Sequence, residues 1–227
     1  MTPDLPPPLS GSDFSRLKTI CIRALVYILI VGAVMQIVML DADNANNSRF
    51  SEFSYTEGLQ TLFLSAIAFL LIYIRRTDSA FPNVALLMLG FILASLAREQ
   101  DHHLDLHVFD GAWQLVVFLI VVPCLVLVWR NREKFLQEFN DYSHSSAFGL
   151  FAAGFLTTYV FSRLYGRTEF WRTLMDASYD RAIKNSAEEV TELMGYMLLF
   201  FATVELLLLV RRLRKNRQEK QSLANSN

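Results

Sequence analysis

The chain has 227 residues, of which 53% are hydrophobic, and its formal net charge is −1. A soluble domain carries about 45–50% apolar residues and distributes them periodically, whereas here they gather in long blocks. These values argue against an ordinary soluble domain, and the small net charge gives no reason to expect a nucleic-acid partner.

Six apolar blocks follow one another along the chain. Crossing a hydrocarbon core of about 30 Å takes about 20 helical residues, so each block, with its flanks, predicts one transmembrane helix. The blocks are 19–40, 59–74, 84–97, 112–129, 147–165 and 190–210. We therefore predict an all-α fold, a polytopic integral membrane bundle of six transmembrane helices over residues 19–210.

The third block is short, with an apolar run of only 14 residues from Val84 to Ala97. A full span of about 20 residues should therefore begin near Pro82 and continue to about Asp101 or His102. On this interpretation the stretch REQDHHLDLH is partly the last turn of a helix, and its final residues belong to the following connection.

The segments outside the bundle differ in composition. Residues 1–18 are rich in Pro and Ser and predict a disordered cytoplasmic tail. The first block is longer than the roughly 7–15 apolar residues of a signal peptide and lacks a clear A-x-A site, so we expect it to remain as an anchor. Residues 211–227 form a basic cytoplasmic tail suited to anionic lipid headgroups.

Lys and Arg concentrate before the first block and after the second, fourth and sixth blocks. Because cytoplasmic loops of membrane proteins are enriched in Lys and Arg, this pattern predicts a multi-pass protein of the inner (plasma) membrane with both termini cytoplasmic. The other connections are acidic or mixed and should face outward. This alternation agrees with six spans.

The connection from 166 to 189 is too polar to span. Its apolar residues recur at helical spacing: Phe170, Trp171, Leu174, Met175, Tyr179 and Ile183. Such a pattern predicts an amphipathic helix between the fifth and sixth spans, which either lies in the outer interface or packs on the bundle.

Carboxylates from several spans gather at the predicted outer ends of the helices. Charged groups within spans are costly and turn toward protein or a water-filled cavity. We therefore predict an externally open acidic pocket between the second, third and sixth helices, with one arginine from the fifth. The pocket residues are Glu57, Gln60, Arg98, Glu99, Asp101, Arg163, Glu189, Glu192 and Tyr196.

Clustered carboxylates need positive charge nearby, because desolvation and mutual repulsion both disfavour their ionised forms. A divalent metal ion could supply this charge, and Glu99 and His102 have the E-x-x-H spacing that di-iron carboxylate bundles use. The candidate ligands are Glu57, Glu99, His102, Glu189 and Glu192. Protons are a second source of charge. The third is Arg98 and Arg163, which would then pair with carboxylates and hold the helix ends together.

The leading functional interpretation is a membrane protein whose acidic pocket binds a divalent cation or protons and serves transport or sensing. A metal-dependent intramembrane hydrolase or lipid-modifying enzyme is the first alternative. A non-catalytic membrane assembly protein is the second. The chain carries no phosphate-binding glycine loop and no nucleophile elbow. The partners we expect are membrane lipids and either a second copy of the chain or another membrane protein.

Overall fold

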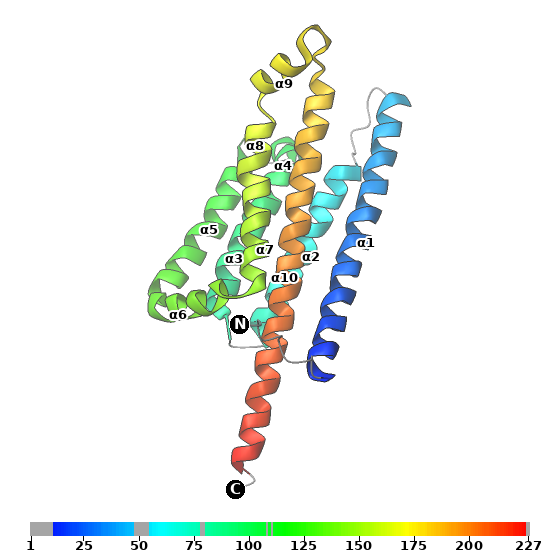
Figure 1. Ribbon diagram of the computed structural model, residues 1–227. Coiled ribbons are helices and arrows are strands. Elements are labelled where there is room, and N and C mark those ends of the chain that lie inside the picture. Colours follow the sequence, from blue (N-terminus) through cyan, green and yellow to red (C-terminus); the bar gives the residue numbers. More distant parts are fainter. Residues whose placement is uncertain (1–10, 48–54, 78–79, 108, 110, 226–227) are drawn as a thin grey trace, which may run out of the picture. The chain divides into compact units, whose positions relative to one another are not determined.

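The computed structural model describes residues 11–47, 55–77, 80–107, 109 and 111–225, with the side chains of 11–13, 16, 41–47, 102–104 and 225 excepted. Every regular element in these ranges is a helix (Figure 1). The prediction of an all-α fold is therefore confirmed for the described residues.

The chain divides into two units, Met1–Phe50 and Ser51–Asn227. The described part of the first unit is a single helix, α1 (Gly11–Asn47). This helix is longer than the apolar block 19–40 from which it was predicted. Residues 11–18 are helical, which corrects the prediction of a disordered tail over that stretch, while residues 1–10 lie outside the described ranges.

The second unit contains all the other helices. They are α2 (Tyr55–Thr77), α3 (Pro82–Glu99), α4 (Asp101–His107), α5 (Ala112–Arg130), α6 (Arg132–Ser143), α7 (Ser146–Phe155), the π-helix η1 (Leu156–Phe161), α8 (Ser162–Tyr165), α9 (Thr168–Met175), the 3-10 helix η2 (Asp176–Ser178) and α10 (Arg181–Asn225). Counted over the described residues, 6 helical segments are long and apolar enough to cross a membrane. These are α1, α2, α3, α5, α10 and the segment Ser146–Tyr165, in which α7, η1 and α8 follow without a break.

The third span ends earlier than predicted. Its helix begins at Pro82, as expected, but it ends at Glu99, where the Gln100 amide donates to the Leu96 carbonyl at 3.2 Å. A separate helix, α4, starts at Asp101. Glu99 and His102 therefore belong to two helices instead of one.

The amphipathic segment before the last span is also divided. α9 ends at Met175, and Asp176 has a φ of 46°, which a continuous right-handed helix does not allow. Ile183 consequently belongs to α10. In α9, Trp171 is buried and its indole nitrogen donates to the Tyr165 carbonyl at 2.8 Å, so this short helix is fixed to the end of α8.

The core of the second unit is formed chiefly by α2, α3, α7 and α10. Leu64, Ile92, Leu199 and Leu206 are 0% exposed. α7 approaches α10 at a pair of glycines, because a Cβ atom at Gly154 would lie only 2.9 Å from the carbonyl oxygen of Gly195. Small residues at such a crossing allow two helix backbones to pack closely.

A carboxylate from α6 caps the first turn of α3. The N-cap residue of α3, Phe81, supplies no side-chain hydrogen bond. Instead Glu138, which is 5% exposed, accepts from the Asn83 amide at 2.8 Å and the Val84 amide at 3.1 Å. Its second oxygen accepts from the Asn83 side-chain amide at 2.8 Å. Glu138 thus satisfies helix-end donors that would otherwise be unpaired and holds α6 against α3.

The turn after α6 is fixed by Tyr142. This side chain is 2% exposed, and its hydroxyl donates to the Ala147 carbonyl at 3.4 Å. Burial raises the pKa of the Tyr142 hydroxyl, because the phenolate would be poorly solvated. The hydroxyl therefore keeps its proton and its role as donor.

Replacing Glu138 with alanine is expected to lower the free energy of unfolding by about 2 kcal/mol, since buried backbone donors lose their acceptor. Unfolding in mixed micelles measures this change. Glu133 lies exposed on the same helix, so Glu133→Ala is the matched control and should change stability by less than about 0.5 kcal/mol. Equal effects of the two substitutions would contradict the capping role.

Candidate functional site

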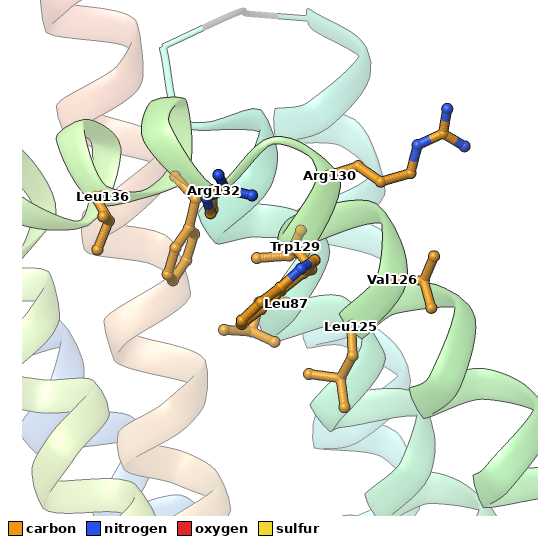
Figure 2. A pocket seen from close by; sticks show the side chains of 9 residues that line it. Leu87, Leu125, Val126, Trp129, Arg130, Arg132 and Leu136 are labelled. Carbon is orange, nitrogen blue, oxygen red and sulfur yellow. The ribbon is translucent and has the colours of Figure 1, made fainter.

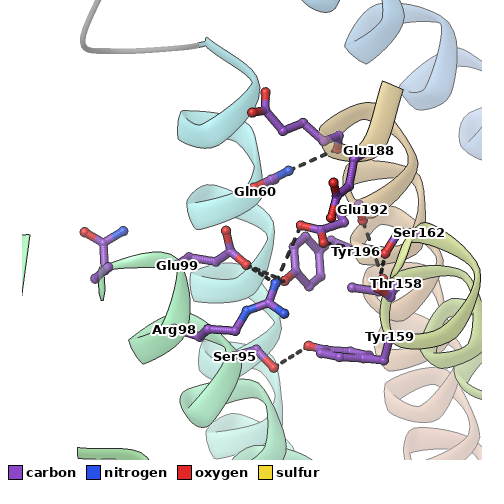
Figure 3. A network of polar contacts seen from close by, with 12 residues as sticks. Gln60, Ser95, Arg98, Glu99, Thr158, Tyr159, Ser162, Glu188, Glu192 and Tyr196 are labelled. Carbon is purple, nitrogen blue, oxygen red and sulfur yellow. Dashed lines mark hydrogen bonds and ion pairs between the residues drawn. The ribbon is translucent and has the colours of Figure 1, made fainter. Parts of the chain in front are cut away.

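A network of charged and polar side chains joins α3, α8 and α10 (Figure 3). α3 contributes two residues from its last turn, α8 contributes one arginine, and α10 contributes a row of residues spaced four apart. We call the polar network the set Arg98, Glu99, Arg163, Lys184, Glu188, Glu192 and Tyr196. The spacing of four on α10 explains why its members share one face.

Glu192 lies at the centre of the polar network. One carboxylate oxygen lies 2.8 Å from Nη2 of Arg163, and the other lies 3.5 Å from Nη2 of Arg98. The Ser162 hydroxyl oxygen lies 3.5 Å from the first oxygen. Glu192 is only 6% exposed. Because the two arginines come from different helices, a single carboxylate ties both α3 and α8 to α10.

Glu99 is held by the residue before it and by α10. Its Oε1 accepts from Nη2 of Arg98 at 2.7 Å and from the Tyr196 hydroxyl at 2.8 Å. Tyr196 is 0% exposed. The Arg98 guanidinium therefore lies against two carboxylates, those of Glu99 and Glu192, which compensates part of the desolvation of its charge.

A third carboxylate, Glu188, extends the polar network along α10. It lies 2.9 Å from Nη1 of Arg163 and 2.6 Å from Nζ of Lys184. At the end of α8, a Cβ atom on Gly166 would overlap the Glu188 carboxylate. Glycine at this position therefore leaves room for the Glu188 carboxylate.

Tyr159 of η1 joins α3 near the polar network (Figure 3). Its hydroxyl forms a hydrogen bond with the Ser95 hydroxyl. The guanidinium carbon of Arg98 lies 5.8 Å from the centroid of the Tyr159 ring, a distance typical of a cation–π contact. Arg98 is thus positioned from one side by an aromatic ring and from the other by carboxylates.

The π-helix η1 shapes the approach of this segment to α10. In a π-helix each backbone hydrogen bond joins residues five apart, compared with four in an α-helix. The residues after η1 are therefore rotated about the helix axis relative to their positions in a continuous α-helix. Thr158 and Ser162 are both 0% exposed. The Thr158 hydroxyl donates to the Glu192 carbonyl at 3.5 Å, and the Ser162 hydroxyl donates to the Thr158 carbonyl. Single π-turns occur often at functional sites.

The charges of the polar network balance. Its carboxylates are those of Glu99, Glu188 and Glu192, and its cations are Arg98, Arg163 and Lys184, with the ion pairs between 2.6 and 3.5 Å long. The sequence left three sources of compensating charge open, and among the described residues arginine and lysine provide it for these three carboxylates.

The predicted metal ligands do not come together in the described part of the chain. Among residues with described side chains, no group of three or more His, Cys, Asp or Glu could hold a metal ion. The His102 side chain lies outside the described residues, so its part in the metal prediction is not tested. Glu99 and Glu192 are both engaged by Arg98.

The other predicted pocket residues lie at the ends of their helices. The Gln60 side chain is 2% exposed and donates to the Glu189 carbonyl at 3.1 Å, which joins α2 to α10. Glu57 and Asp101 are exposed in the first turns of α2 and α4. α2 packs against both α3 and α10, and the fifth span contributes more to the site than one arginine.

The polar residues missed by the sequence interpretation are Ser95, Thr158, Tyr159, Ser162, Lys184 and Glu188. A signal was present for three of them. Ser95 stands four residues before Glu99, Tyr159 four before Arg163 and Glu188 four before Glu192, so each has the helical spacing to a predicted site residue. Thr158, Ser162 and Lys184 do not have this spacing to a predicted site residue.

Nothing in this arrangement supplies an activated nucleophile. The polar network offers carboxylates that can take up protons, two guanidinium groups and a buried tyrosine hydroxyl. Comparison of the chain with protein-family models, curated proteins and solved structures found no match.

Proposed function

We propose that this protein is a six-span protein of the inner membrane that takes up and releases protons at Glu192, in transport or in sensing. Membrane insertion is supported by the 6 long apolar helices and by their surfaces. Large apolar side chains such as Phe69, Phe118 and Leu119 are 60% exposed or more, whereas Gln60 and Glu192 are buried. This distribution is the reverse of that in a soluble bundle and suits a hydrocarbon solvent.

The orientation in this proposal follows the distribution of basic residues. Arg75 and Arg76 end α2, and Arg130 ends α5. In each of these two spans, the arginines lie at the end far from the polar network. Since cytoplasmic ends of spans are enriched in Lys and Arg, this distribution supports an outer position for the polar network and cytoplasmic termini.

The observation that carries the proton proposal is the position of Glu192 between Arg98 and Arg163, at 3.5 and 2.8 Å. Protonation of Glu192 would neutralise a carboxylate that contacts both arginines, so both contacts would weaken at once. Because these contacts tie α3 and α8 to α10, uptake of a single proton changes the packing of three helices. Arg163 is 47% exposed, which gives water a path to the carboxylate.

A proton needs less rearrangement of this site than a divalent cation does. A divalent ion would have to displace two guanidinium groups that already contact the carboxylates, whereas a proton adds to one oxygen without displacing an atom. The divalent-cation and enzyme interpretations stay predictions.

Infrared difference spectra of the protein in vesicles, recorded between alkaline and acidic buffer, test the proposal. We expect a carboxylic acid band to appear on acidification. The band should be absent from Glu192→Gln and present in Glu192→Asp, which keeps a carboxyl group. Glu205 lies on the same helix, outside the polar network, so Glu205→Gln is the control and should keep the band.

A second measurement links proton uptake to helix packing. Spin labels on exposed positions of α8 and α10 should move apart on acidification in the wild type and remain at one distance in Glu192→Gln. Vesicles loaded with a pH-sensitive dye then separate transport from sensing, since only transport carries protons inward. If Glu192→Gln keeps the full infrared band, the proton site is not Glu192 and the proposal fails.

A further inference from the structure

An open apolar groove lies at the opposite end of α3 from the polar network (Figure 2). It has a volume of about 750 Å³, within the range of about 300–1,000 Å³ typical of ligand sites. The side chains that form its walls are Leu87 of α3, Leu125, Val126 and Trp129 of α5, and Phe135 and Leu136 of α6.

The groove exists because the chain turns sharply between α5 and α6. Asn131 is the only residue between the two helices, and it both ends α5 and begins α6. Its amide donates to the Val128 carbonyl at 3.1 Å, and its carbonyl accepts from the Phe135 amide at 2.9 Å. The two helices therefore diverge from one point and leave an apolar notch against α3.

Cationic side chains stand where the apolar walls end. Arg130 and Arg132 line the groove and are exposed. In Figure 2, Arg132 lies at the turn above Leu87 and Trp129, while Arg130 extends outward from the end of α5. In the part of the chain that the structure describes, neither arginine forms an ion pair with a carboxylate. Their charges are available to an external anion.

A second, smaller cavity adjoins the groove. It has a volume of about 250 Å³ and shares Leu87 and Phe135 with the groove. Its other walls are aliphatic and aromatic side chains, among them Phe91 and Phe148. An apolar chain that enters between α5 and α6 would thus contact a continuous apolar surface that extends to α7.

We infer that this groove binds an anionic phospholipid, with an acyl chain along the apolar walls and the headgroup phosphate at Arg130 and Arg132. Along the groove, cationic side chains stand at the turn and apolar side chains follow. A phospholipid has the matching arrangement, with a charged headgroup followed by hydrocarbon chains. Trp129 is 71% exposed beside the arginines, and tryptophan is enriched at the level of lipid headgroups. Basic pockets between helices on the cytoplasmic side are suited to anionic headgroups.

A second copy of the chain is a poorer occupant. An apolar protein surface seated on the groove would cover the rim and remove two arginines from water without supplying a counter-charge, which is costly. A phosphodiester supplies that charge and an apolar chain together. The inference needs membrane insertion, but it is independent of proton uptake at Glu192.

Native mass spectrometry of the detergent-purified full chain tests the inference. Phosphatidylglycerol and phosphatidylcholine with the same acyl chains are the probes, and we expect preferential retention of phosphatidylglycerol. The double variant R130Q/R132Q should retain about tenfold less, because each arginine near a headgroup strengthens anionic lipid binding. The control R212Q/R214Q removes the same charge from exposed positions on α10 and should keep the wild-type preference.

A second pair of variants tests the apolar part of the site. Leu125 lines the groove, so Leu125→Trp should fill it and lower retention of both lipids. Leu119 is 60% exposed on the same helix and does not line the groove, so Leu119→Trp should bind as the wild type does. Equal losses from the two arginine pairs, unchanged binding in Leu125→Trp, or a protein dimer in place of the lipid adduct would each overturn the inference.

Discussion

Replacing Glu192 with alanine is expected to lower the free energy of unfolding by about 3 kcal/mol, the low end of the range for removing one partner of a buried ion pair. The substitution removes from Arg98 and Arg163 the carboxylate that contacts both of them. The low end applies because Arg163, at 47% exposed, can turn toward water. Denaturant titration in mixed micelles measures the change.

The same helix provides a matched control. Glu219 of α10 pairs with Lys215 at 3.8 Å, but both side chains are largely exposed, at 61% and 77%. Exposed pairs of this kind contribute little, so Glu219→Ala should cost less than about 0.5 kcal/mol. A Glu192→Ala effect no larger than that of Glu219→Ala would show that the buried pairing does not stabilise the fold.

A double-mutant cycle separates the Arg163 contact from the rest of the polar network. Arg163→Ala, Glu192→Ala and their combination should be non-additive by about 1 kcal/mol or more, since residues in one salt-bridge network couple in this range. Additive losses would place the stabilising contribution of Glu192 with Arg98 and Ser162 alone.

The second large effect is expected at the crossing of α7 and α10. In Gly195→Ala the new Cβ would lie 2.9 Å from the Thr158 amide nitrogen and 3.0 Å from the Gly154 carbonyl oxygen, and it would overlap the Thr158 hydroxyl. Because two of these atoms belong to backbone, the helices must move apart. We expect a loss of about 3 kcal/mol, the upper part of the range for overpacking.

A second glycine on this pair of helices supplies the control, with an expected change in stability of the opposite sign. Gly149 of α7 has nothing within 4 Å of its would-be Cβ. Gly149→Ala should therefore stabilise the protein by up to about 1 kcal/mol, because alanine is the better helix former. Loss of stability in both variants would indicate that glycine is needed for backbone conformation, and the close approach would then not be the cause.

The Gly195 prediction also bears on the candidate site. Thr158 lies in η1, and its hydroxyl donates to the Glu192 carbonyl. Separation of the helices at Gly195 should lengthen the Arg163–Glu192 contact, so the infrared signal of Glu192 should shift in Gly195→Ala and remain in Gly149→Ala. This readout distinguishes a local overlap from general loss of folding.

The number and order of the long helices could be predicted from the sequence, because hydropathy is a local property that depends only on which residues are consecutive. The start of α3 at Pro82 followed from the length of a span. The ends of two helices were missed. α3 ends at Glu99, and α10 runs on to Asn225 through a mostly exposed basic segment, where Arg, Lys, Gln and Glu favour a helix although they form no apolar block.

Hydropathy and charge alone indicate that Arg98, Glu99, Arg163 and Glu192 lie near the ends of spans and need partners. Which of them pair is visible only in the folded chain, because pairing depends on the rotation of each helix about its axis and on the register between helices far apart in the chain. The π-helix η1 and the glycine crossing set that register for α8. The same reason hid the cap that Glu138 provides to α3, which joins positions 55 residues apart.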